Sequence, residues 1–164
     1  MANIGDHKPR IIRMSYEIKT DGKFKFIEEG EGEPLMLLHG LFGALSNFRD
    51  LIEHFSKINK VIVPLLPLLE LDLLHTSVGG LQKFVLRFIE HRNYDQINLL
   101  GNSVGGHVAL VHILKNPQRI KSLTLTGSSG LFENGIGDTY PDRGDREYIR
   151  KKTQLTFYDP TMAT

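Results

Sequence analysis

Segments whose apolar residues have the spacing of a strand alternate along the chain with segments whose apolar residues have the spacing of a helix. The pattern predicts strands interleaved with helices. Polar and apolar residues alternate in Ser15–Lys19 and in Lys23–Glu28, on the two sides of Asp21-Gly22. This pattern is typical of a β-hairpin. Four later runs are apolar and of strand length, and they predict four further strands. These runs are residues 35–38, 60–64, 97–100 and 120–126.

Three segments carry apolar residues at helical spacing. The first is predicted to begin at Ser46, a residue suited to capping a helix, and to run to about Phe55. The second covers Thr76–His91, and the third follows residue 103 and ends before Asn116-Pro117. Because the strands alternate with helices, the sequence predicts an α/β fold with a mostly parallel sheet and helices on both faces.

The segment between the predicted fifth strand and the third helix carries chemistry. It reads Gly101-Asn102-Ser103-Val104-Gly105, a G-x-S-x-G nucleophile elbow in the strand–turn–helix context that the motif requires. A serine hydroxyl is a weak nucleophile, so an enzyme exposes it at a sharp turn near a base and oxyanion donors. Glycine removes side chains where strand and helix pack closely. A glycine-rich turn without catalytic function is the alternative interpretation.

A second motif follows the predicted third strand, in the stretch PLMLLHGLFG at residues 34–43. Together with GNSVGG at residues 101–106 it resembles the α/β-hydrolase fold family, in particular the serine-nucleophile group of carbon–carbon bond hydrolases and small esterases. The resemblance implies that Ser103 is the nucleophile and that the backbone N–H groups of Leu41 and Val104 form the oxyanion hole. It also implies a loop-shaping role for His39, and supporting roles for the motif glycines Gly40, Gly101 and Gly105.

The same resemblance implies a domain organisation. In the family the triad acid and histidine follow the nucleophile in chain order, after later strands. We therefore expect a chain truncated after the sixth strand, with acid and histidine in a missing C-terminal part. Residues 1–140 would form the N-terminal part of the hydrolase core, and residues 141–164 the start of a lid or cap insertion.

Residues inside the chain offer few substitutes for that histidine and acid. His107 lies four residues after Ser103, on roughly the same side of the predicted helix, and is either a base or a residue that packs or contacts solvent. After the sixth strand, Glu133, Asp138 and Asp142 could supply an acid. Two functions remain open. One is a serine hydrolase acting on an ester or on a carbon–carbon bond next to a carbonyl. The other is a non-catalytic scaffold or binding fragment that needs a complementing chain.

Composition narrows the classes of partner. The 164 residues include no cysteine and carry a formal net charge of +1, which gives no reason to expect disulfides, thiol catalysis or nucleic-acid binding. The histidines show no metal-ligand spacing, and no apolar run approaches a membrane span. The start of the chain is polar, so we expect a cytoplasmic protein without a secretory signal. The expected partners are a small-molecule acyl substrate and either a second copy of the chain or a complementing C-terminal fragment. The chemistry requires no cofactor and no metal.

Overall fold

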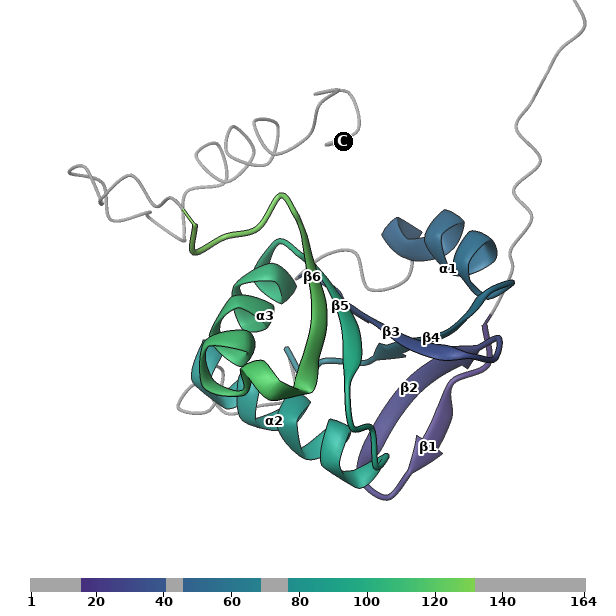
Figure 1. Cartoon of the computed structure of the whole chain (residues 1–164), viewed down its shortest axis with the longest axis horizontal. Coiled ribbons are helices and arrows are strands. Elements are labelled where there is room, and N and C mark those ends of the chain that lie inside the picture. The colour runs from purple at the N-terminus through teal and green to yellow at the C-terminus, as the bar shows by residue number, and fades with distance from the viewer. Residues whose placement is uncertain (1–15, 41–45, 69–76, 132–164) are drawn as a thin grey trace, which may run out of the picture. The chain divides into compact units, whose positions relative to one another are not determined.

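The computed structural model describes residues 16–40, 46–68 and 77–131. These residues contain six strands and three α-helices (Figure 1). The strands are β1 (Lys19–Asp21), β2 (Phe24–Glu29), β3 (Glu33–Leu38), β4 (Asn59–Pro64), β5 (Ile97–Asn102) and β6 (Ile120–Thr126). The helices are α1 (Arg49–Phe55), α2 (Val78–His91) and α3 (Val104–Lys115), with short 3-10 helices at Ser46–Phe48 and Pro117–Arg119.

The strands form one mixed sheet in the order β1-β2-β4-β3-β5-β6. Strands β4, β3, β5 and β6 are parallel, whereas β2 pairs antiparallel with both β1 and β4. The prediction of a mostly parallel sheet in an α/β fold is confirmed. Because parallel strands end at the same edge, the segments that follow β3 and β5 leave the sheet side by side.

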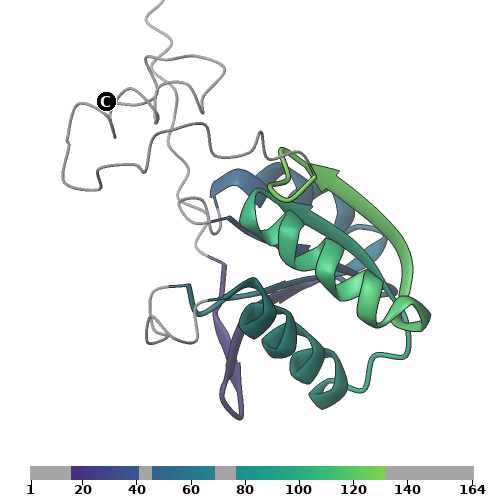
Figure 2. The same cartoon turned by 90° about the vertical axis from the view of Figure 1, so that its left-hand side faces the viewer.

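Apolar side chains from both faces of the sheet form two cores. Adjacent residues in a strand point to opposite faces, so Met36 and Leu38 pack toward α2 and α3 while Leu37 packs toward α1. Figure 2 shows α2 and α3 together on one side of the sheet, with α1 on the other. The expectation that helices cover both faces is therefore confirmed.

The first strand and the first helix begin at other residues than the sequence predicts. The first strand was expected at Ser15–Lys19, but β1 pairs with β2 only over the three residues Lys19–Asp21. Tyr16, which precedes β1, instead contacts the start of α1, where its hydroxyl donates a hydrogen bond to the carbonyl of Arg49. The first helix was expected to be capped by Ser46, yet a 3-10 turn occupies that position and Phe48 stands at the N-cap of α1.

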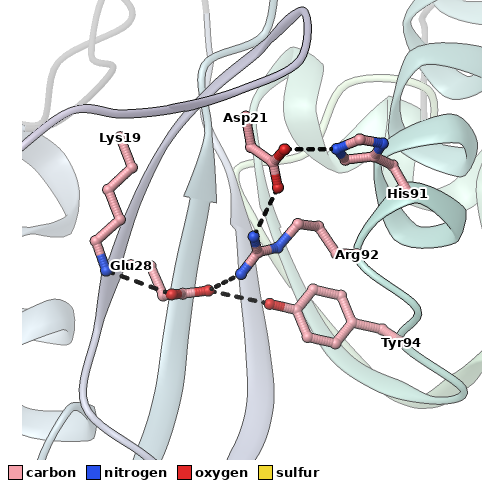
Figure 3. A network of polar contacts seen from close by, with 6 residues as sticks. All are labelled: Lys19, Asp21, Glu28, His91, Arg92 and Tyr94. Atoms are coloured by element: carbon pink, nitrogen blue, oxygen red, sulfur yellow. Dashed lines mark hydrogen bonds and ion pairs between the residues drawn. The ribbon is translucent and has the colours of Figure 1, made fainter.

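A polar network joins the β1–β2 hairpin to the C-terminal end of α2 (Figure 3). The guanidinium of Arg92 donates to Asp21 and to Glu28, each across 2.9 Å, and lies 4.9 Å from the ring centre of Phe26. His91 also contacts the Asp21 carboxylate. The network holds the hairpin against the helix that covers one face of the sheet.

Some predictions stay predictions. The proposed domain boundary near residue 140 and the acids Glu133, Asp138 and Asp142 lie outside the described residues. None of the helices in the described ranges is long and apolar enough to cross a bilayer.

Candidate functional site

The two sequence motifs meet at the carboxyl edge of the sheet. Strands β3 and β5 are neighbours, and Leu38 at the end of β3 is paired with Gly101 of β5. A Cβ atom placed on Gly40 would lie 2.9 Å from Cβ and 3.3 Å from Oγ of Ser103. The His39-Gly40 segment therefore lies directly against the side chain of Ser103. Leu41, the next residue, lies outside the described residues.

Ser103 has an unusual backbone conformation at this edge. Its dihedral angles are φ = 54° and ψ = −122°, and it occupies the N-cap of α3. A non-glycine residue held in such a region costs about 1–3 kcal/mol, so the surrounding structure must enforce it. The side chain is exposed. The result is a hydroxyl presented to solvent on a strained turn.

The motif glycines allow β5 and α3 to pack closely around that turn. A Cβ on Gly101 would lie 2.6 Å from the Cα of Gly106, and a Cβ on Gly105 would overlap the carbonyl group of Leu38. Real Cβ atoms do not approach backbone this closely, so a side chain at either position would push strand and helix apart. Glycine is required here for space rather than for a positive φ, since neither residue adopts one.

The first turn of α3 supplies backbone N–H groups near Ser103. Val104 is the first residue of the helix, and the N–H groups of a first turn have no acceptor inside the helix. The N–H groups of Gly106 and His107 donate to the Ser103 carbonyl, at 3.0 and 3.2 Å. A helix N-terminus favours negative charge, so the position of Val104 suits an oxyanion donor.

His39 is engaged by the backbone on both sides of its ring. Nε2 accepts a hydrogen bond from the N–H of Leu66 across 2.9 Å, so the proton lies on Nδ1, which is 2.9 Å from the carbonyl oxygen of Gly40. Burial lowers the pKa of His39, and the contact with Gly40 opposes that shift only in part. The ring is thus held neutral, with neither nitrogen directed at Ser103.

None of the other described histidines is hydrogen-bonded to Oγ of the serine. The His107 ring packs against Gly130, where a Cβ would lie 2.6 Å from the imidazole. His112 is fully buried and contacts Gln82 of α2. Across the described ranges, no imidazole nitrogen is hydrogen-bonded to Oγ of Ser103, and no three His, Asp or Glu side chains are grouped as a metal site.

Sequence reasoning missed the segment that follows β6. The N–H and Oγ of Ser129 both point at the Ser103 carbonyl oxygen, at 3.2 and 3.4 Å. The stretch GSSG at residues 127–130 gave only a loop signal in the sequence. The contact depends on the parallel pairing of β5 with β6, which brings Asn102 opposite Thr126.

Comparison with known proteins identifies the family of the chain. Residues 74–157, about half of the chain, match the family described as the alpha/beta hydrolase fold. This segment includes the elbow, the strand before it and the helix after it. The chain therefore belongs to the α/β-hydrolase fold family, as the resemblance of its motifs implied.

Individual relatives cover several enzyme activities. A solved α/β hydrolase enzyme from the metagenome of sediments of the lagoon of Mar Chica, Morocco, is 46% identical, with a TM-score of 0.68 over 71% of this chain and 54% of that one. The 2-hydroxy-6-oxo-2,4-heptadienoate hydrolase of Pseudomonas putida is 27% identical over 82% of this chain and 52% of its own length. The dihydrolipoyllysine-residue acetyltransferase component of the acetoin cleaving system of Pseudomonas putida is 30% identical over 81% of this chain and 38% of its own. The chain thus spans about half, or less, of the length of these relatives.

Proposed function

We propose that this chain carries the nucleophile and the oxyanion hole of a serine hydrolase that cleaves an ester or a carbon–carbon bond next to a carbonyl. The observation that carries the proposal is Ser103 itself. Its hydroxyl is exposed on a strained turn at a helix N-terminus, with the His39-Gly40 loop against it. An ordinary surface serine requires none of these features, whereas the nucleophile elbow of an α/β-hydrolase combines them.

The chemistry is addition to a carbonyl carbon followed by elimination. Oγ of Ser103 attacks the carbon while its proton passes to a histidine, and the carbonyl electron pair moves onto oxygen. The N–H groups of Val104 and Leu41 stabilise that oxyanion. When the tetrahedral intermediate collapses, the alcohol or carbon leaving group departs with the proton, and an acyl-serine remains. Water then attacks the acyl group and releases an acid, which regenerates the serine.

The histidine and the acid of the triad are proposed to come from a further part of the protein. Two observations support this: no described imidazole nitrogen bonds to Ser103, and the matched relatives are about twice as long as the matched segment or longer. In this arrangement His39 holds the loop and does not move protons, because both of its ring nitrogens are engaged with backbone.

Intact mass before and after treatment with a fluorophosphonate tests the nucleophile, with Ser103→Ala as the control. We expect the full-length protein, which supplies the histidine, to form a single adduct that is absent in the variant. The substrate class is tested on the full-length protein by turnover of short acyl esters against turnover of a vinylogous diketone. Turnover of neither class would contradict the hydrolase assignment.

A second candidate function follows because no imidazole among the described residues is hydrogen-bonded to Ser103. The chain would then be a non-catalytic scaffold or binding fragment that associates with a complementing chain or a second copy. A folded chain that associates with a second copy or with a complementing C-terminal fragment, and forms no fluorophosphonate adduct either alone or in that complex, would support this alternative.

A further inference from the structure

The peptide groups on both sides of the Ser103 Cα are tied to the end of β6 and the residues after it. The Ser103 N–H donates to the carbonyl of Thr126 across 3.2 Å, and its carbonyl accepts the N–H of Ser129 across 3.2 Å. Asn102 adds two bonds in the same direction, from its side-chain amide to the carbonyl and the hydroxyl of Thr126, each across 3.0 Å. The elbow is therefore held from outside its own strand and helix.

Side chains reinforce this attachment. The segment Gly127–Leu131, called the strap below, packs over the first turn of α3. A Cβ on Gly106 would lie 2.5 Å from Oγ of Ser128, and a Cβ on Gly130 would lie 2.6 Å from the His107 ring. Gly130 also has φ = +84°, a conformation that glycine adopts without strain. The strap can lie this close to the helix only because glycine occupies both positions.

We propose that the strap is a positioning device for the nucleophile, in which Ser129 fixes the carbonyl of Ser103 and keeps the strained elbow in its reactive geometry. The inference rests on the proposed function of Ser103. The strained dihedral angles persist only where neighbouring contacts over-determine them. Within the helix, only the Ser103 carbonyl is held, by the N–H groups of Gly106 and His107. Strand β6 and the strap hold both of its backbone groups, because Thr126 accepts from the Ser103 N–H and Ser129 donates to the Ser103 carbonyl.

The reactivity of the serine therefore depends on a segment without a reacting group. A displacement of about 1 Å at a reacting atom lowers rates by up to about a hundredfold. Loosening the strap is expected to reduce the rate of attack by Ser103 without removing the hydroxyl. It is expected to change the affinity for a small reagent less, because the strap does not cover the Ser103 side chain, which stays exposed.

The test is a double-mutant cycle on the contact between Gly130 and His107 in the full protein. Gly130→Ala places a methyl group against the imidazole and is expected to lower the maximal rate of fluorophosphonate labelling about tenfold or more, with the half-saturating reagent concentration unchanged. Gly127→Ala is the matched control, because Gly127 also has a positive φ but has no neighbouring atom within 4 Å. His107→Ala in the Gly130→Ala background removes the obstructing ring and is expected to restore most of the rate.

Amide hydrogen exchange at Ser129 measures the contact independently of any reactivity. We expect a protected Ser129 amide in the wild type, loss of protection in Gly130→Ala and recovery in the double variant. An unprotected Ser129 amide in the wild type would overturn the proposed positioning role of the strap. So would equal labelling rates in Gly130→Ala and the wild type, and so would loss of labelling in His107→Ala alone, which would assign the effect to the imidazole.

Failure of the proposed function is recognisable separately. If the folded wild type with any complementing fragment forms no adduct on Ser103, the serine is not an activated nucleophile and the hydrolase assignment fails. Hydrogen exchange at the Ser129 amide then still tests whether the strap holds the backbone of the elbow.

Discussion

The side-chain amide of Gln82 donates a hydrogen bond to Nδ1 of His112 across 3.3 Å in a contact that is buried from solvent. The pair joins α2 to α3, the helix that begins at the elbow. Because Nδ1 accepts, the proton of the neutral imidazole lies on Nε2, which has no partner among the described residues. The structure therefore holds a neutral histidine in its core at a helix–helix contact.

This burial makes stability depend on pH. Desolvation lowers the pKa of His112 below its ordinary value of 6.5, and it does the same for His39. The unfolded chain then binds protons at a higher pH than the folded chain, so the free energy of unfolding falls as the pH falls below about 6.5. Urea unfolding at pH 7 and pH 5.5 is expected to show a lower midpoint at the lower pH.

The double variant Gln82→Leu/His112→Leu isolates the contribution of the pair. Replacing both partners with apolar groups of similar size leaves no orphaned polar atom, so the variant is expected to stay near wild-type stability at pH 7. Its midpoint should change less between the two pH values, with the remainder due to His39. An unchanged pH dependence would show that His112 is protonated equally in both states.

Gly105 is predicted to be intolerant of the smallest side chain. Gly105→Ala would force a methyl group into the carbonyl of Leu38 and within 2.7 Å of the carbonyl of His39, and is expected to cost about 3 kcal/mol of unfolding free energy. Gly79→Ala in the first turn of α2 is the matched control, because its nearest neighbour would be 3.8 Å away. That change should stabilise the protein by about 0.5–1 kcal/mol. Chemical denaturation measures both, and equal effects would contradict the close packing.

The sequence predicts most of the fold because its signals are local. Strand β6 matches its predicted range Ile120–Thr126, and α3 ends before Asn116-Pro117 as expected. The start of α2 differs by little, since Ser77 caps the helix through the N–H of Gly80 instead of leaving Thr76 inside it. Apolar periodicity and capping residues suffice for these elements.

Contacts between distant segments were not predictable in the same way. Nothing near Ser129 in the sequence indicates that its N–H meets the Ser103 carbonyl, because that contact requires the register of β5 against β6. The burial of His112 against Gln82 likewise depends on how two helices pack. The motifs identified Ser103 as a candidate, and tertiary pairing supplies the groups that hold it.

His39 is expected to matter for stability even though its ring does not face the serine. His39→Ala removes the acceptor of the Leu66 N–H in a buried site, which costs about 1–3 kcal/mol. His54→Ala is the control, since His54 is exposed on α1 and its loss should change the free energy of unfolding by less than about 0.5 kcal/mol. A wild-type melting temperature in His39→Ala would mean that Leu66 finds another acceptor.

Glu28 is the carboxylate at the centre of the hairpin network, and its ionisation is expected to stabilise the fold. Burial raises the pKa of its carboxyl, but Arg92, Lys19 and Tyr94 together outweigh that effect and hold the pKa below its usual 4.5. The ionised form is thus favoured in the folded state, and its stabilisation is present above about pH 4.5 and is lost as the pH falls through the folded pKa. Glu28→Gln should lower the free energy of unfolding by about 1 kcal/mol at pH 7, since solvent screens part of the pair.

The dependence of the unfolding free energy on pH below 4.5 distinguishes this ionic contribution from simple packing. The difference between wild type and Glu28→Gln should shrink below pH 4.5, because the wild-type carboxyl becomes neutral and then resembles the amide. Glu29→Gln in the same strand is the control, since Glu29 forms no ion pair among the described residues and should behave like wild type across the range. A difference that stays constant down to pH 3 would show that Glu28 acts through shape and hydrogen bonding alone. Arg92 would then hold the hairpin chiefly through Asp21 and the face of Phe26.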